Sequence, residues 1–217
     1  MTWPAVWDAG DVVPGRTLAE THQRVTEAAA WLHEEEYLPV AIGGGHDLTF
    51  PFVRPLTQAG ARYLAGVYFD AHLDVRVEEG SGMAFRRLVE EGGIRELHLH
   101  GLRPLVNATE HLAWFQKQGG VAVADGAPFV LPPRPHRLFV SFDLDVLDMA
   151  YAPGVSAPNP SGWTPREAEV RVRACGADPR VRCFDLMELC PEHDEGGRTA
   201  RLAAHLFLMF LAGVATR

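Results

Sequence analysis

Apolar and polar positions follow two periods along this chain, one typical of buried strands and the other typical of helices. Short apolar runs predict strands at residues 38–42, 63–69, 94–102, 121–124, 137–146 and 182–189. Helical patterns lie between them, at residues 17–36, 84–91, 108–119, from 164 and at 198–213, with a short helical stretch after Asp47. Strands that alternate with helices are typical of an α/β fold with a mainly parallel sheet.

Local signals support these boundaries. The two T-x-x-E segments, 17–20 and 164–167, have the spacing of a capping box, and Pro165 takes the favoured first position of a helix. Segment 128–135 is expected on the surface, because proline supplies no donor to a strand ladder. The helix-free stretch 148–162 is long for a compact domain and suggests a binding or active-site loop.

The composition is that of an ordinary globular protein, and we expect a single domain over residues 1–217. A formal net charge of −8 argues against nucleic-acid and anionic-membrane surfaces, which need basic patches, and favours a small-molecule partner. No apolar stretch reaches the ~20 residues that cross a bilayer, and the first residues lack the features of a secretory signal. Cys175, Cys183 and Cys190 show no C-x-x-C spacing, so neither a disulfide framework nor a thiolate zinc site is indicated. We therefore expect a cytoplasmic protein.

Three short acidic and histidine motifs each follow an apolar run: GGGHD at residues 43–47, DAHLD at 70–74 and DLD at 143–145. Successive side chains of a strand alternate between faces. We therefore expect the two aspartates and the histidine of DAHLD to share one side, and the two aspartates of DLD to do the same. Ligands of open α/β sheets bind at the carboxyl ends of the strands, which is where all three motifs fall.

These motifs supply two imidazoles and four carboxylates as candidate metal ligands. They are His46, His72, Asp70, Asp74, Asp143 and Asp145. Each motif also has an ordinary structural explanation, as a glycine turn, a helix cap or a surface histidine, but that explanation has to account for all of them at once. Four like charges gathered at the edge of a sheet need a positive partner, and two divalent cations would balance them. Carboxylate-rich ligation without thiolates favours an ion such as manganese over structural zinc.

The order of the motifs resembles that of the ureohydrolases, the family of arginase, agmatinase and formimidoylglutamase, along nearly the whole chain. The shared order is G-G-x-H, D-A-H-x-D, S-x-D-x-D and then an acidic residue in x-x-E-x-x-P. The resemblance implies a three-layer, doubly wound, arginase-like fold with helices on both faces of the sheet, and two Mn²⁺ ions per chain. It assigns one ion to His46, Asp70, Asp74 and Asp143, and the other to Asp70, His72, Asp143 and Asp145. Asp70 and Asp143 would then bridge the two ions.

The activity that this resemblance implies is hydrolysis of a carbon–nitrogen bond in a linear amidine or guanidine by a metal-bridging hydroxide. In the family, the carboxylate that corresponds to Asp145 hydrogen-bonds this hydroxide and passes a proton to the leaving nitrogen. Glu188 matches the family glutamate that pairs with the cationic nitrogens of the substrate. The ordinary alternative for Glu188 is a solvated charge at the end of a strand.

Several details are most similar to the formimidoylglutamase branch. They are the acid after GGGH, D-V-R at 74–76, S-G-M at 81–83, P-G-V-S-A-P at 153–158 and R-T-A-R-L-A at 198–203. The resemblance therefore predicts conversion of formimidoylglutamate to formamide and glutamate, with agmatinase-type or arginase-type hydrolysis of a guanidino compound as the alternative. Arg76 is the candidate for holding a substrate carboxylate, because its planar fork binds carboxylates bidentately, although an arginine here is as often a surface residue. Ser81 is a second candidate substrate contact.

The chain also departs from the family pattern. Family members usually carry a further strand and substrate-facing loops before the segment that begins here at Trp7, so we expect a shortened amino terminus and an incomplete substrate wall. Cys190 stands where the family usually has asparagine. A rival of another class is thus an inactive relative that binds metal and acts as an interaction protein. A two-metal phosphoesterase is disfavoured, because in that family D-x-H precedes the G-N-H motif. Since relatives often form trimers or hexamers, we expect a homo-oligomer.

Overall fold

One parallel sheet forms the centre of the computed structural model, which describes residues 2–58, 64–124, 126–133 and 137–217. Its strand order is β1-β6-β5-β2-β3-β4, and each neighbouring pair is parallel. The strands are β1 (Val40–Ile42), β2 (Leu64–Phe69), β3 (Leu97–His100), β4 (Gly120–Val123), β5 (Arg137–Asp143) and β6 (Val181–Met187). The predicted parallel α/β fold is confirmed. Tyr63 of the predicted strand 63–69, and Arg134 and Pro135 of the predicted surface segment, lie outside the described residues.

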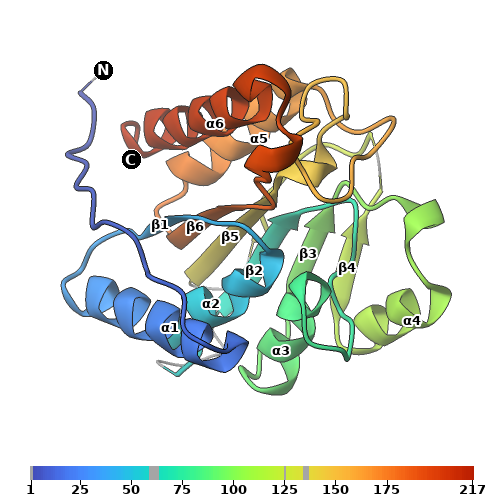
Figure 1. Cartoon of the computed structure of the whole chain (residues 1–217), viewed down its shortest axis with the longest axis horizontal. Coiled ribbons are helices and arrows are strands. Elements are labelled where there is room, and N and C mark those ends of the chain that lie inside the picture. Colours follow the sequence, from blue (N-terminus) through green and yellow to red (C-terminus); the bar gives the residue numbers. More distant parts are fainter. Residues whose placement is uncertain (1, 59–63, 125, 134–136) are drawn as a thin grey trace.

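Helices cover both faces of the sheet (Figure 1). One face carries α1 (Leu18–Glu34), α2 (Thr49–Gln58), α3 (Ala84–Glu90) and α4 (Thr109–Lys117), and the other carries α5 (Pro165–Ala177) and α6 (Arg198–Val214). Each face has its own buried apolar cluster, with Phe85 and Phe115 on the first side and Phe184 and Phe210 on the second. The three-layer, doubly wound arrangement is therefore also confirmed.

The helix starts follow the predicted capping signals. The side chain of Thr164 accepts a hydrogen bond from the Glu167 amide, and the Glu167 carboxylate accepts one from the Thr164 amide, so a complete capping box begins α5. Thr17 caps α1 in the same way, but the Glu20 carboxylate accepts from the Arg16 amide instead. The hydrogen bond of the Glu20 side chain thus comes from the amide of the residue before Thr17, and not from that of Thr17 as a capping box predicts.

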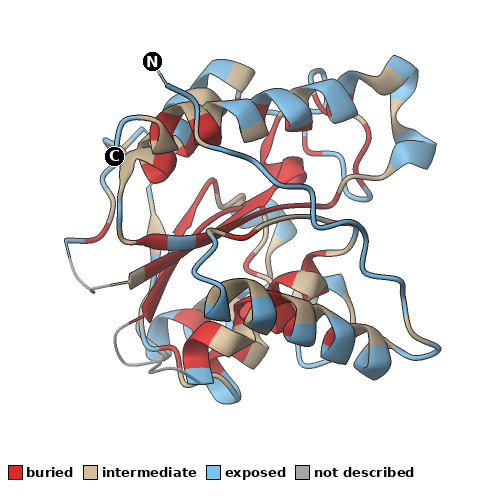
Figure 2. Cartoon of the chain, turned by 90° about the vertical axis from the view of Figure 1, so that its left-hand side faces the viewer, coloured by how far each residue is buried: buried red, intermediate tan, exposed pale blue. Residues whose placement is uncertain are grey.

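The two strands at the centre of the sheet are buried along almost their whole length (Figure 2). Their apolar side chains face helices on both sides, which explains why both sequences are nearly continuous hydrophobic runs. Gly66 of β2 allows the sheet to pack closely, because a Cβ atom there would lie 2.3 Å from the ring of Phe139 on β5. The motifs that follow these two strands therefore begin at buried positions, Asp70 after β2 and Asp143 at the end of β5.

The argument from shared strand faces is wrong, because most of the motif residues lie beyond the ends of the strands. β2 ends at Phe69, so residues 70–74 form an irregular loop in which Asp74 has the left-handed φ of 49°. β5 ends at Asp143, and Leu144–Val146 form a 3-10 turn. The motif aspartates therefore do not alternate along a strand, because the backbone leaves the sheet before the strand period can act.

No helix in the described part of the chain is long and apolar enough to cross a membrane. The apolar α6 instead packs on α5 and buries Leu206 and Phe210 against the sheet.

Candidate metal centre

The motif residues meet at the carboxyl ends of four adjacent strands, β1, β6, β5 and β2. His46 begins a 3-10 turn, His46–Leu48, shortly after β1. Asp70 directly follows β2, Asp143 is the last residue of β5, and Glu188 directly follows β6. Since these strands are parallel, their carboxyl ends lie at one edge and bring together residues that are far apart in the sequence.

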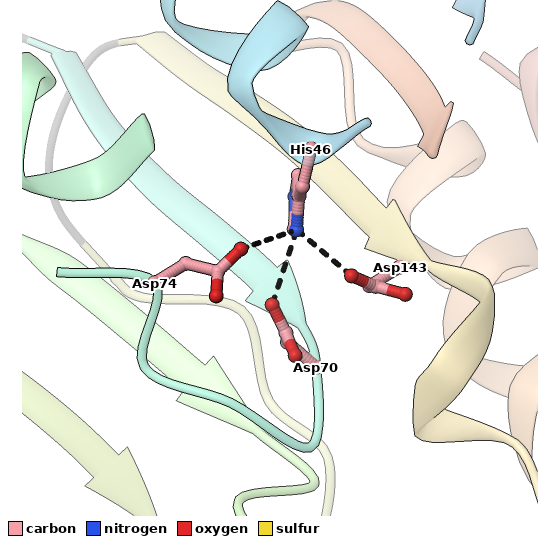
Figure 3. Close-up of side chains that lie close together, drawn as sticks. All are labelled: His46, Asp70, Asp74 and Asp143. Atoms are coloured by element: carbon pink, nitrogen blue, oxygen red, sulfur yellow. Dashed lines mark ion pairs between the residues drawn. The ribbon is translucent and has the colours of Figure 1, made fainter. Parts of the chain in front are cut away.

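The first of two side-chain clusters surrounds the imidazole of His46 (Figure 3). Its Nδ1 atom lies 3.1 Å from Asp70 Oδ2, 3.0 Å from Asp74 Oδ2 and 3.0 Å from Asp143 Oδ2. Two of the carboxylates come from the loop after β2 and the third from the end of β5, and they converge on one nitrogen. Four ligand-type groups thus meet at one point within the protein.

A second cluster adjoins the first and shares Asp70 with it. His72 Nδ1 lies 2.9 Å from Asp145 Oδ2 and 3.4 Å from Asp70 Oδ1. The side chain of His72 is 23% exposed, whereas Asp70 and Asp145 are buried, so this cluster opens toward solvent at the histidine. Asp70 can therefore serve both clusters, one with each carboxylate oxygen. Asp143 belongs to the first cluster, and its Oδ1 atom accepts a hydrogen bond from the Asp145 amide.

Burial and like charge make this arrangement costly unless positive charge is present. Burial raises the pKa of Asp143, and the charges of Asp145 and Asp70 raise it further. Burial alone would lower the pKa of His72, but hydrogen bonds to Asp145 and Asp70 outweigh it and raise that pKa to about 11. Burial alone would also lower the pKa of His46, but the carboxylates around it outweigh burial and raise that pKa. The raised pKa values favour protonation of these groups when no cation is bound, and binding of metal ions would release protons.

The donor set fits divalent cations for a geometric reason as well. The His46 Nδ1 and Asp70 Oδ2 atoms are buried and have no hydrogen-bond partner among the described residues, although they lie 3.1 Å apart. One N–H group can point at one acceptor, not at three carboxylates around it. Groups that face a common point without bonding one another are arranged as ligands of an ion. The donors are carboxylate oxygens and imidazole nitrogens without a thiolate, and this set suits Mn²⁺.

A buried polar network fixes the orientation of His46. The Ser141 hydroxyl donates to Asp185 Oδ1 at 2.5 Å, and the Thr49 hydroxyl donates to Asp185 Oδ2 at 3.0 Å. Since Ser141 donates to the aspartate, its oxygen accepts from His46 Nε2–H at 2.8 Å. This assigns the proton of neutral His46 to Nε2 and leaves the Nδ1 lone pair facing the cluster, which is what a metal ligand requires. The sequence interpretation missed this network, although an aspartate within the apolar run RCFDLM was a usable signal.

Glu188 lies beside the clusters and fastens two loops. Its backbone has a φ of 66°, and its side chain is buried. Oε1 accepts from the His46 amide at 2.8 Å, and Oε2 accepts from the Ser156 hydroxyl at 2.6 Å. The carboxylate thus joins the glycine turn before His46 to the predicted binding loop 148–162. It is not the solvated strand-end charge of the alternative explanation, and Ser156 is a partner that the sequence interpretation missed.

A cleft of about 400 Å³ opens next to both clusters. It is lined by His72, Asp74, Arg76, Glu78, Val106, Asn107, Ala108 and His111. The structure therefore brings Arg76 to the same cleft as one residue from each cluster. Ser81 is exposed, lies beside the Gly45 turn and is not among the residues that line this cleft.

Comparisons with known proteins agree with this geometry. Residues 1–213 match the model of the arginase family. The chain is 40% identical to formimidoylglutamase from Halobacterium salinarum, over 96% of this chain and 73% of the relative. It superimposes on formimidoylglutamase from Bacillus subtilis with a TM-score of 0.85 at 26% identity, covering 95% of this chain and 71% of that one. For formiminoglutamase from Trypanosoma cruzi with two Mn²⁺ ions, the TM-score is 0.87 at 28% identity, with 97% and 76% covered.

Proposed function

The chain belongs to the arginase family of dinuclear metal hydrolases, and we propose that it hydrolyses N-formimidoyl-glutamate to formamide and glutamate. The observation that carries the proposal is the pair of clusters that share Asp70 beside a cleft lined by Arg76. Formimidoylglutamases from several organisms are similar to the chain over nearly its full length. The substrate class of the family is a small amidine or guanidine.

We assign the two manganese ions to the two clusters. His46, Asp70, Asp74 and Asp143 would hold the first ion, and Asp70, His72 and Asp145 the second. Asp143 is not among the residues of the second cluster, so its bridging role stays a prediction. When bound, the two cations lower the pKa of water and so supply a nucleophile at neutral pH.

The residues of the chain provide the proton transfer. Burial and the charge of Asp70 raise the pKa of Asp145, which favours this carboxyl group as the one that accepts a proton and releases it again. Water adds to the amidine carbon and gives one proton to Asp145. The bond from that carbon to the glutamate nitrogen then breaks, and Asp145 passes the proton to the leaving nitrogen. The products are formamide and glutamate with a free amino group.

Substrate binding requires both an anionic and a cationic group. An amidinium presents N–H donors to a carboxylate, and Glu188 is the candidate, since it can exchange the Ser156 hydroxyl for the substrate. The glutamate half of the substrate carries two carboxylates, and Arg76 is exposed in the cleft to bind one of them. Ser81 remains a candidate contact only if the substrate extends beyond the lining of the cleft.

The proposal is tested with protein reconstituted in Mn²⁺ and offered formimidoylglutamate and a panel of guanidino acids and agmatine. Release of formamide and glutamate supports the assignment, whereas release of urea identifies a guanidino hydrolase of the same family. Two bound ions without turnover on any member of the panel would favour the inactive relative.

Two further expectations belong to this proposal. We propose a cytoplasmic location, because Cys175, Cys183 and Cys190 are free thiols, which suits a reducing compartment. We also propose a homo-oligomer, by analogy with the family. Cell fractionation and light scattering test these two points separately.

A further inference from the structure

Asn107 connects the loop of the second motif to the beginning of α4. Its Oδ1 atom accepts from the Leu73 amide at 2.9 Å, and its Nδ2 atom donates to the carbonyl oxygens of Ala71 and Arg103, both at 2.8 Å. The two loop residues that it binds lie on either side of His72. One half-buried side chain therefore makes hydrogen bonds on both sides of a metal-ligand position.

The loop needs such support because little regular structure holds it. Residues 70–74 follow the end of β2, and Asp74 has a φ of 49°, a conformation that is unfavourable for most side chains. The Ala71 carbonyl also accepts from the Arg103 amide at 2.9 Å, and the Leu73 carbonyl accepts from the Tyr68 hydroxyl at 3.1 Å. Asn107 supplies the side-chain hydrogen bond to the Leu73 amide, which lies between His72 and Asp74.

We propose that Asn107 is a positioning residue for the second metal ion. The inference rests on the proposed dinuclear centre. The first cluster has four ligand groups, of which only Asp74 lies within residues 71–74. The second has three, and His72 is carried by the loop that Asn107 holds. Loosening the loop therefore removes one ligand of three from the second ion but one of four from the first.

The test compares Mn²⁺ binding by the wild-type protein and by Asn107→Leu and Asn107→Asp, using equilibrium dialysis and the electron paramagnetic resonance of the bound ions. The wild type should bind two ions per chain with the spectrum of a coupled pair. Asn107→Leu removes all three hydrogen bonds at nearly constant volume and should weaken the second ion roughly 10- to 100-fold, leaving the spectrum of an isolated ion. Loss of an indirect contact to a ligand has this effect, whereas general destabilisation would weaken both ions together.

Asn107→Asp separates positioning from charge. Aspartate keeps the acceptor for the Leu73 amide but loses both donors, and it places a carboxylate against two carbonyl oxygens. Positioning predicts weaker binding of the second ion, while an electrostatic effect alone would strengthen it, because a carboxylate attracts Mn²⁺.

His111→Leu is the matched control. His111 lies in the first turn of α4 and lines the same cleft, but its side chain makes no hydrogen bond to the described residues. It should retain both ions. Binding of two ions by both Asn107 variants with wild-type affinity would overturn the inference and leave the proposed function intact. Failure of the wild type to bind Mn²⁺ would overturn both.

Discussion

Replacing Asp70 by asparagine should remove both metal ions, because Asp70 is the residue that the two clusters share. Its Oδ2 faces His46 in the first cluster, and its Oδ1 faces His72 in the second. Asparagine has the same shape and can still accept from the His72 amide, as Asp70 Oδ1 does at 2.6 Å. The substitution therefore removes the charge from both sites while keeping the loop anchored.

The size of the effect follows from the linkage of binding and folding. An ion that binds only the folded chain stabilises it by about 2.7 kcal/mol at a free concentration of 100 times its Kd. Two ions then contribute about 5 kcal/mol, which corresponds to a rise in melting temperature of about 10–20 °C for a domain of this size. The wild type should show this rise when Mn²⁺ is added to the metal-free protein, and Asp70→Asn should show almost none.

Asp74→Asn provides the internal comparison. Asp74 contributes to the first cluster alone, so this variant should keep the second ion and about half of the Mn²⁺-induced rise. Asparagine tolerates the left-handed φ of 49° at this position at least as well as aspartate, so the folded backbone is not strained. The exposed Asp11→Asn variant, which makes the same change in net charge, should behave as the wild type.

The assay is differential scanning fluorimetry at several Mn²⁺ concentrations, with metal content measured on the same samples. If Asp70→Asn kept two ions per chain and the full rise in melting temperature, the assignment of Asp70 to both clusters would be wrong. Equal losses in Asp70→Asn and Asp74→Asn would mean that the two sites do not bind independently.

Three further predictions concern other residues. Glu188→Gln can keep hydrogen bonds to the His46 amide and the Ser156 hydroxyl, so the metal content should be retained. The value of kcat/KM should fall roughly 10- to 100-fold, because the charge-assisted hydrogen bond to the substrate amidinium is lost. An unchanged kcat/KM would exclude a role of Glu188 in substrate binding. Arg76→Met should raise KM for formimidoylglutamate roughly tenfold with little change in kcat, and steady-state kinetics that show the reverse would contradict a carboxylate-binding role. Burial lowers the pKa of His100 from 6.5 to about 4, with a further contribution from the charge of Arg171, so the unfolded chain binds a proton there before the folded chain does. Folding stability from this group is therefore lost as pH falls from about 6.5 toward 4. The His100→Phe variant should lose about 2 kcal/mol less folding stability than the wild type between pH 7 and pH 4.5, measured by urea unfolding of the metal-free proteins. Equal losses in both proteins would contradict this prediction.

Much of the fold was predictable because a parallel sheet leaves a strong local pattern. Strands buried on both faces require continuous apolar runs, and the runs that become β2 and β5 were located within a few residues. The same rule placed the motifs at the carboxyl edge, since each follows such a run. The end of β5 was predicted less well, because Leu144 and Val146 continue the apolar pattern after the ladder has stopped at Asp143.

The sequence by itself determined the order of the elements and the kinds of ligand that gather at one edge of the sheet. It did not determine which ligand joins which cluster, because that depends on how the loop 70–74 turns after leaving β2 and on its left-handed residue Asp74. The partners of these residues, Ser141 and Asp185 behind His46 and Asn107 beside His72, come from other strands and loops. Hydrogen bonds between segments that are distant in the chain leave no periodic signal in it, and only the tertiary structure brings them together.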